Sequence, residues 1–466
     1  MKDSVKSWTF VFREAVFMSW LATFLYGLTM GVIFTHGSPY ISGGLALLTV
    51  LLAMNGLART ELWLTSRGPQ WWKEHPFLQT LHHVSSEGEM AGIVVGLSVL
   101  LAHLIVSHGV LHVHLPISEA CTLFGIMSVA NSSAPHMLPI LEWLSKRTGV
   151  VGVIFFGSLL SSITGEPAAA VFLSRFVDEA VSEDERARVA TGLAATIGSG
   201  GGLLPFAAPP VLIVWGTLQA KLAWSFGTLF LFVGLGCVLH VAVVAWKVRK
   251  FLPVNPSSVS EKEYTMTRKT AFAVQSIVTI VALNIWAPHS TLVMTFNVVV
   301  GLLCLGEAFY AKKGFVETWQ PLILAFLLMA LEIIGHEADP LLAALASQIP
   351  ETWNLLVIGL VLWYASAFTS HFADNALASR VYMAAAVSIG AASLHAHAGS
   401  FLAACVLLGA LFGGFALIPA NLPNFAISRI LQVSPGEWLR TASKEYYYSL
   451  YVHVGFITCM YLLLFR

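Results

Sequence analysis

The chain has 466 residues, of which 57% are hydrophobic and 11% charged, whereas soluble domains carry roughly a quarter charged residues. Lysine plus arginine and aspartate plus glutamate number 25 each, so no net charge favours binding to nucleic acid. This composition excludes a water-soluble fold. Apolar runs long enough to cross a ~30 Å hydrocarbon core recur along the sequence and predict an all-α polytopic membrane protein.

The apolar windows, taken in chain order, predict roughly 11 to 13 membrane segments. The windows are 14–35, 41–58, 90–110, 117–131, 149–163, 168–178, 187–214, 224–248, 269–287, 291–310, 319–335, 354–371, 375–393, 399–418 and 446–465. Lys2, Lys6 and Arg13 precede the first window, but no small-residue cleavage site follows it, so we expect this helix to be retained. Short windows around a polar tip, near 149–178 and 354–393, predict re-entrant hairpins.

A basic linker divides the chain into two halves. Its lysines and arginines indicate a cytoplasmic location by the positive-inside rule. We expect an N-terminal half at 1–248, with a hairpin near 149–178 and a broken helix near 187–214, a cytoplasmic linker at 249–268, and a C-terminal half at 269–466, with a hairpin near 354–393 and a broken helix near 399–433.

The two halves contain matching motifs when Glu166 is aligned with Asp374. Ser161–Ala168 and Thr369–Ala376 each give two hydroxyls, three residues, an acid and then small residues. A second pair of motifs, each a glycine pair followed by prolines four apart, covers 200–210 and 413–424. Two matches in the same order predict an internal duplication. Glycine and proline free backbone groups from the helix ladder, which membranes tolerate only inside protein or around a cavity.

Glu166 and Asp374 are the main candidates for a functional site. A carboxylate at bilayer depth costs on the order of 3 kcal/mol, so it is seldom present without a task. We expect the two acids and Asn375 to bind a small hard cation and, alternately, protons. The expected supporting groups are Ser162, Thr164, Gly201, Gly202, Pro205, Thr369, Ser370, Asn421 and Asn424. The alternative is that both acids only cap helices, with Pro167 in the first helical position.

The motifs 164–168, 200–210, 373–377 and 413–424 resemble those of the ion transporter superfamily, which contains sodium/proton antiporters, arsenite permeases and citrate or dicarboxylate permeases. The chain looks most similar to a family of sodium/proton antiporters. The resemblance implies two inverted-topology repeats, each with a re-entrant hairpin and an unwound helix. It also implies a scaffold that often forms homodimers, and elevator-like alternation. Dicarboxylate members carry Ser-Asn-Thr at both tips, where this chain has acids, which favours a cation or neutral arsenous acid.

We therefore expect a secondary transporter of the cytoplasmic (inner) membrane that exchanges sodium, or another small cation, for protons. Its partners would be small ions and lipid, with no nucleic acid, no resident metal and no cofactor beyond the transported Na⁺ and H⁺. The alternative function is an arsenite or organic-anion permease. An enzyme is not expected, because the sequence has no His-Glu-x-x-His or Gly-x-Ser-x-Gly motif.

Two further groups of polar residues are expected to lie at the membrane interface. His103, His108, His112 and His114 cluster near the end of one window; a metal site or pH sensor is the alternative. A group of polar residues at the end of an apolar run is interpreted as a loop: Glu332, His336, Glu337 and Asp339.

Overall fold

The computed structural model describes residues 2–67, 88–107, 115–178, 180–206, 208–252, 267–287, 290–311, 315–350, 353–372, 374–418 and 421–465. Every regular element in these ranges is a helix, which confirms the all-α prediction for this part of the chain. Several predicted features lie outside the described residues: His108, His112 and His114, residues 253–266 of the linker, and Ala207, Ala373, Pro419 and Ala420 at the motifs.

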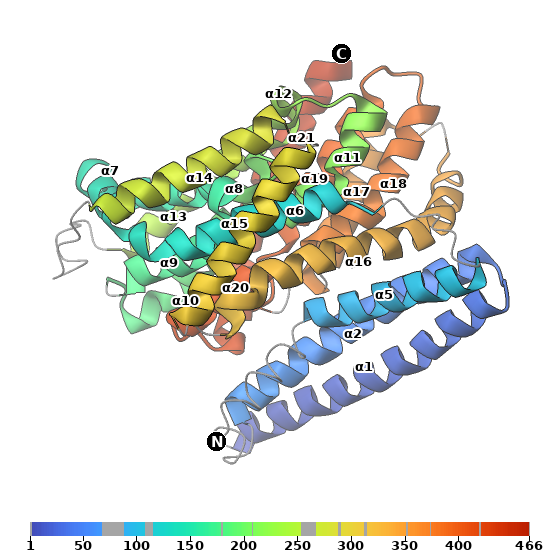
Figure 1. Cartoon of the computed structure of the whole chain (residues 1–466), viewed down its shortest axis with the longest axis horizontal. Helices are drawn as coiled ribbons and strands as arrows, with labels where there is room; N and C mark the ends of the chain where they lie inside the picture. The colour runs from blue at the N-terminus through green and yellow to red at the C-terminus, as the bar shows by residue number, and fades with distance from the viewer. Residues whose placement is uncertain are drawn as a thin grey trace.

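Figure 1 shows how the described helices are arranged in chain order. They are α1 Lys2–Phe34, α2 Pro39–Arg67, α5 Gly88–Val106, α6 Ile117–Ser133, α7 Leu138–Leu159, α8 Ser161–Thr164, α9 Glu166–Asp178, α10 Arg186–Gly200, α11 Pro209–Leu222, α12 Phe226–Leu229, α13 Leu235–Val248, α14 Arg268–Trp286, α15 Thr291–Tyr310, α16 Phe315–Ala346, α17 Leu355–Phe372, α18 Asn375–Ala392, α19 Ala398–Gly413, α20 Leu422–Ile430 and α21 Pro435–Phe465. Single short turns of other helix types include η3 Gly201–Leu203 and η4 Phe230–Gly234.

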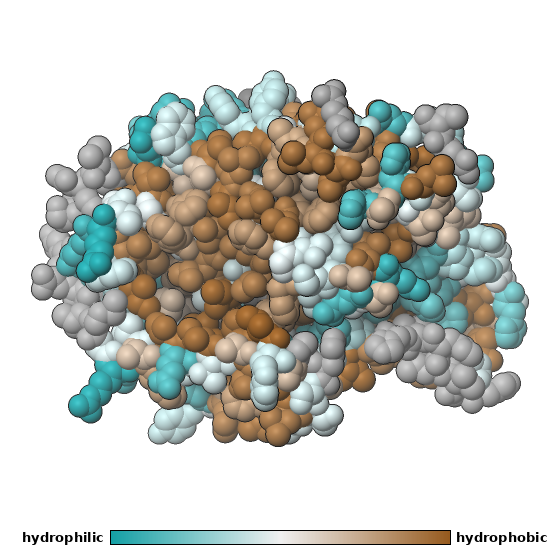
Figure 2. Space-filling view, turned by 90° about the horizontal axis from the view of Figure 1, so that it is seen from above, coloured by the Kyte–Doolittle hydropathy of each residue, from teal (hydrophilic) through white to brown (hydrophobic). Residues whose placement is uncertain are grey.

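Among the described residues, eight helical stretches are long and apolar enough to cross a membrane, and three shorter apolar helices accompany them. The space-filling view shows a broad apolar face bordered by polar residues (Figure 2). Large exposed side chains such as Phe17, Trp20 and Phe272 suit lipid contact. The chain is a multi-pass membrane protein.

The predicted windows coincide with helices, with one clear difference at α16. The sequence predicts a loop after 335, whereas α16 continues to Ala346 through the whole acidic group and past Pro340. The loop prediction was wrong because these side chains form ion pairs with neighbouring helices, described below, so the helix can continue at depth.

Helices are interrupted at each of the four predicted motifs. Between α8 and α9 the backbone turns at Gly165, whose φ of 83° lies in the left-handed region that favours glycine. Asp374 separates α17 from α18 with extended backbone, at φ −62° and ψ 143°. The chain leaves α10 at Gly200 and resumes at α11, and it leaves α19 at Gly413 and resumes at α20.

Glycines at these interruptions bring neighbouring helices into close contact. A Cβ atom on Gly200 would lie 2.0 Å from the carbonyl oxygen of Ser158 on α7, and one on Gly413 would lie 2.2 Å from that of Ala367 on α17. Any larger residue would push the helices apart. These two glycines therefore fix how α10 packs on α7 and how α19 packs on α17.

Packing between the halves is reciprocal. Helix α9, which begins after the turn at Gly165, packs against α20, and α18, which begins after Asp374, packs against α11. Helix α19 lies at the centre of the body and is buried almost completely. Helices α1, α2 and α5 form a layer beside the body and meet it mainly at α16 (Figure 1). The helix interruptions at Gly165, Asp374, Gly200 and Gly413 thus lie inside the body.

Candidate functional site

Glu166 begins α9 directly after the left-handed turn at Gly165, and only 2% of its surface is exposed. Its Oε2 accepts a hydrogen bond from Asn421 Nδ2 of the opposite half at 2.9 Å. Its Oε1 has no hydrogen-bond partner among the described residues. A Cβ atom on Gly201 would lie 2.7 Å from this oxygen, so the glycine leaves the space that the carboxyl group faces. The structure thus holds one oxygen of a buried acid and leaves the other available.

Asp374 is positioned differently, because it is the N-cap of α18. Its Oδ1 accepts a hydrogen bond from the backbone N–H of Ala376 at 2.7 Å. The side chain is buried, at 7% exposure, and its charge is close enough to Glu166 for the two carboxylates to interact electrostatically. Asp374 therefore does cap a helix, as the alternative reading predicts, whereas Glu166 makes no capping hydrogen bond that the structure describes.

Asn375, the first residue of α18, is fully buried at the second tip. Its Oδ1 lies 2.5 Å from Ser370 Oγ, while its Nδ2 has no partner among the described residues. A Cβ atom on Gly414 would lie 2.5 Å from this nitrogen. Asn375 thus faces the second glycine pair as Glu166 faces the first.

A serine ahead of each tip contacts the neighbouring helix break in the same way. Ser161 Oγ lies 2.9 Å from the carbonyl oxygen of Ile197, and Ser370 Oγ lies 2.9 Å from that of Ala410. Each carbonyl belongs to the third residue before the first glycine of its break. The two serines therefore occupy equivalent positions.

This equivalence shifts the expected alignment of the halves by one residue. The fifth residue after Ser161 is Glu166, and the fifth after Ser370 is Asn375 rather than Asp374. In the helix breaks, Asn421 precedes α20 where Ala208 precedes α11. The sequence alignment matched residue types at the tips, whereas the contacts match backbone positions. The equivalent positions are therefore unequal, because the first half has the acid Glu166 where the second has the amide Asn375.

The remaining predicted residues mostly serve the local backbone. Thr164 and Ser162 donate to carbonyls one turn earlier, at 3.1 and 2.8 Å, and Thr369 lies 3.0 Å from the hydroxyl of Tyr382. Asn424 Nδ2 lies 2.7 Å from the carbonyl oxygens of both Gly414 and Leu417 and thereby supports the break before α20. These residues make no described contact with Glu166.

The other two predicted backbone residues lie in the first break. Gly202 faces Leu411 and Cys237, because a Cβ atom there would lie 2.6 and 2.7 Å from their side chains. Pro205 is buried in the turn that leads to α11. Of this break, Gly201 is the residue that faces the carboxyl group directly.

A cavity of about 290 Å³ lies against the outer face of α9. Pro167 and Ala168, in the first turn after Glu166, form part of its wall. Its polar lining comes from α6, α9, α15 and α16: Ser128, Asn131, Ser132, Arg175, Glu307 and Gln320. Ser132 donates a hydrogen bond to Glu307 at 2.9 Å. The cavity thus combines polar side chains from four helices with the first turn of α9. Sequence reasoning did not identify them.

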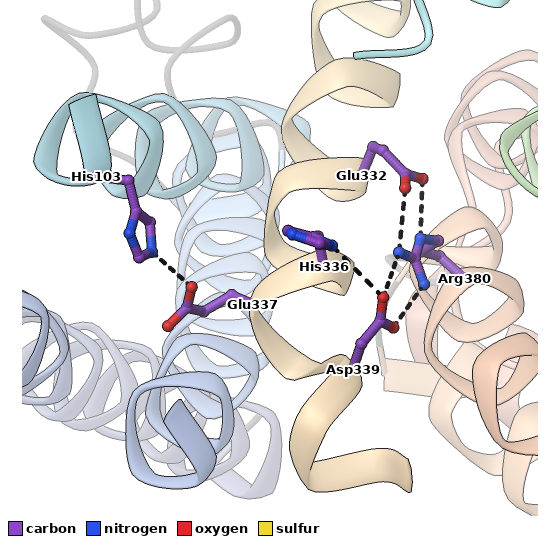
Figure 3. A network of polar contacts seen from close by, with 6 residues as sticks. All are labelled: His103, Glu332, His336, Glu337, Asp339 and Arg380. Atoms are coloured by element: carbon purple, nitrogen blue, oxygen red, sulfur yellow. Dashed lines mark hydrogen bonds and ion pairs between the residues drawn. The ribbon is translucent and has the colours of Figure 1, made fainter. Parts of the chain in front are cut away.

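Arg380 is the second group that the sequence prediction missed (Figure 3). From α18 it forms paired hydrogen bonds of 2.8 to 3.0 Å to Glu332 and Asp339 of α16. On another face of α16, Glu337 contacts His103 of α5 at 2.6 Å and also accepts from Ser42 of α2. The sequence contained a signal for this contact, because a lone arginine in an apolar window needs a carboxylate partner.

No group of three or more histidine, cysteine or acidic side chains in the described ranges could hold a metal ion. His103, the described member of the predicted histidine cluster, contacts Glu337 instead. Compared with protein-family models and with curated protein sequences, the chain matches none of them.

Proposed function

We propose that the protein is a secondary active transporter of the cytoplasmic membrane that exchanges sodium, or another small cation, for protons at Glu166. The observation that supports this most directly is the unequal state of its two carboxyl oxygens. Oε2 accepts from Asn421, and Oε1 is buried without a partner beside Gly201. Because the amide N–H of Asn421 already points at Oε2, a proton on Oε2 could not point toward Asn421. We therefore expect the proton or the cation to bind at Oε1.

The chemistry of a buried carboxylate explains why exchange follows. An ionised carboxylate in an apolar setting is costly unless a positive charge accompanies it. Glu166 can satisfy this requirement with a proton or with a hard cation, which prefers oxygen ligands. Because both compete for the same oxygen, binding one releases the other. Asp374 adds a second negative charge nearby and thereby strengthens the demand for a positive one.

The reciprocal packing supports a duplicated architecture. A two-fold relation between the halves would exchange the α9–α20 contact for the α18–α11 contact, and both contacts are present. Discontinuous helices from two repeats that meet at a central ion site are a common plan of secondary transporters. We propose that the halves are inverted repeats and that the tips at Gly165 and Asp374 belong to re-entrant hairpins.

The second candidate function is a permease for arsenite or an organic anion, and the cavity beside α9 is the observation that favours it. Arg175, Asn131 and Gln320 in its lining could bind a neutral or anionic solute. Such a solute would have to bind away from Glu166 and Asp374, whose charges repel anions. The cavity fits the exchanger equally well as the route by which a hydrated cation reaches α9.

Proton movement in proteoliposomes with an internal pH dye tests the proposal. Vesicles with an acidic lumen receive Na⁺, Li⁺, K⁺, arsenite or succinate in turn. We expect alkalinisation of the lumen after addition of a small cation. Uptake of arsenite or succinate without any cation-triggered proton movement would contradict the exchanger and support the permease.

Two substitutions of Asp374 separate its capping role from its charge. Asparagine caps a helix as well as aspartate, so Asp374→Asn is expected to keep the folding stability, whereas Asp374→Ala should cost about 1 kcal/mol. We expect Asp374→Asn to lower cation-triggered proton flux by about tenfold, equivalent to roughly 1.4 kcal/mol, because the charge beside Glu166 is lost. Transport equal to that of the wild type would leave Asp374 as a cap only. Thermal unfolding in detergent and the vesicle assay measure the two effects.

Filling the cavity is expected to slow cation entry. Val171 lines the cavity wall on α9, and tryptophan at this position would occupy part of its volume. We expect Val171→Trp to reduce cation-triggered flux severalfold without loss of thermal stability. Val278→Trp, at a position 58% exposed on α14, is the matched control and should transport normally. Normal flux through Val171→Trp would exclude this cavity as the cation route.

A further inference from the structure

Ser199, His240 and Ser449 form a buried hydrogen-bonded chain, here called the file, that joins α10, α13 and α21. His240 of α13 occupies its centre, with Nδ1 2.6 Å from Ser199 Oγ and Nε2 2.6 Å from Ser449 Oγ. All three side chains are fully buried. Each ring nitrogen therefore faces a hydroxyl that can both donate and accept a proton.

A second histidine lies beside this file. The ring centroid of His453 is 4.8 Å from that of His240, and the side chain is 2% exposed. Both of its ring nitrogens lack hydrogen-bond partners among the described residues. Buried polar atoms are normally paired, because leaving them unpaired costs about 1 to 3 kcal/mol. This cost indicates a functional reason for a polar group here rather than a packing one.

One end of the file reaches a basic surface of the protein. Glu445, Ser449 and His453 recur at intervals of four residues and thus share a face of α21. Glu445 Oε2 pairs with Lys247 of α13 at 2.7 Å, while its Oε1 has no partner among the described residues. Lys247 is followed by Arg249 and Lys250 at the start of the basic linker, which the positive-inside rule assigns to the cytoplasm.

The other end reaches the helix break that Glu166 faces. Ser199 is the residue before the glycines that end α10, and Gly201 in that break is directly beside Glu166 Oε1. Cys237, one turn before His240 on α13, faces Gly202 of the same break. Gly201 and Gly202 carry no side chains, and Gly201 lies directly beside the carboxyl oxygen.

We propose that Glu445, Ser449, His240 and Ser199 form a proton path between the cytoplasmic surface and Glu166. This inference rests on the proposed exchange function. A proton passes from the Ser449 hydroxyl to Nε2 of His240, and the proton on Nδ1 passes to Ser199 Oγ, whose own proton moves on toward Glu166. One proton enters and one leaves, and the ring changes tautomer. The same steps in the opposite order, in which Glu166 gives up its proton toward the surface, return the ring to its starting tautomer.

The surroundings of His240 are consistent with this role. The titratable groups around it are His453, the Glu445–Lys247 pair toward the surface and Cys237 toward the break. The cavity beside α9 is lined from α6, α9, α15 and α16, whereas the file is built from α10, α13 and α21. Protons and cations would thus reach the same carboxylate by separate routes.

Two assays on the full chain in proteoliposomes test the path. The first is Na⁺-triggered proton flux, and the second is exchange of radioactive Na⁺ for unlabelled Na⁺ at equal pH on both sides, which requires no net proton transfer. For His240→Gln we expect at least a tenfold loss of the first rate and little change in the second. Ser366→Ala, a buried serine that bonds to the carbonyl oxygen of Val406, is the matched control and should show neither effect.

If His240→Gln fails to fold, Ser199→Ala and Ser449→Ala test the same path, because each removes a hydroxyl that contacts His240. Each should slow the first rate by severalfold, increase its sensitivity to replacement of H₂O by D₂O, and spare the second. Equal loss of both rates in all three variants would mean a structural role, and wild-type rates in all three would exclude the path. If the wild type exchanges labelled Na⁺ but moves no protons, or transports no cation at all, the exchange function itself fails, which is a separate result.

Discussion

Replacing Glu166 by glutamine is expected to abolish cation-triggered proton movement, with a fall of at least about a hundredfold, equivalent to roughly 2.8 kcal/mol. Glutamine has nearly the same shape and can still accept from Asn421 through its carbonyl oxygen, so the contact across the two halves can survive. In the variant, the amide NH₂ group of glutamine lies beside Gly201 in place of Oε1. An amide carries no negative charge and does not bind a proton near neutral pH. The fold should be kept while the exchange is lost.

The matched control is Glu142→Gln on α7. Glu142 pairs with Lys146 one turn away at 3.0 Å, in a surface pair that contributes little to stability. This variant should transport at the wild-type rate in the same vesicles. Glu166→Asp provides a finer test, because the shorter side chain keeps the charge but moves it away from Asn421; we expect partial activity with weaker apparent cation affinity. Wild-type flux through Glu166→Gln would remove Glu166 from the mechanism.

Replacing Arg380 by methionine is expected to destabilise the protein by up to about 3 kcal/mol, because it leaves two partly buried carboxylates, with side chains 20% and 34% exposed, without their partner. Arg380 is 8% exposed and binds both Glu332 and Asp339 through paired hydrogen bonds. Lysine offers a single ammonium group and cannot reproduce both pairs, so Arg380→Lys should also be less stable than the wild type. Thermal unfolding of the purified protein in detergent measures both losses.

Neutralising the partners should restore much of this stability. In the triple variant Arg380→Met, Glu332→Gln, Asp339→Asn, no uncompensated charge remains, so we expect its melting temperature to return most of the way to that of the wild type. The double variant without the arginine change leaves a buried cation and should be unstable. If Arg380→Met melts at the wild-type temperature, the contact between α16 and α18 is held by packing rather than by these ion pairs.

Local sequence patterns were sufficient to predict the helices and where they break. Apolar windows located the membrane segments, because the bilayer fixes the required length and composition. Glycine and proline marked the interruptions at Gly200 and Gly413, where the backbone must approach another helix closely. Local composition failed at α16, because the acids that suggested a loop are paired with residues about 40 to 300 positions away in the sequence.

The sequence pointed to individual candidate residues and not to the contacts between them. Glu166 and Asn421 were both expected to contribute, yet only the folded chain brings the amide of one half to the acid of the other. The alignment of residue types matched Glu166 with Asp374, whereas equivalent backbone contacts match it with Asn375. A one-residue shift of this kind cannot be detected from composition, because hydroxyl residues are adjacent at both tips.

The position of α16 between the N-terminal layer and the body has a consequence for the order of synthesis. Helices α1, α2 and α5 leave the ribosome first but meet the rest of the chain mainly at α16, more than 200 residues later. Until then they can associate only with one another in the bilayer. When α16 emerges, Glu337 finds Ser42 and His103 already present, whereas Glu332 and Asp339 must wait for Arg380 on α18. The polar partners of α16 are therefore synthesised in two groups, one before it and one after it, and the later partner is Arg380 on α18, the helix that begins at Asn375.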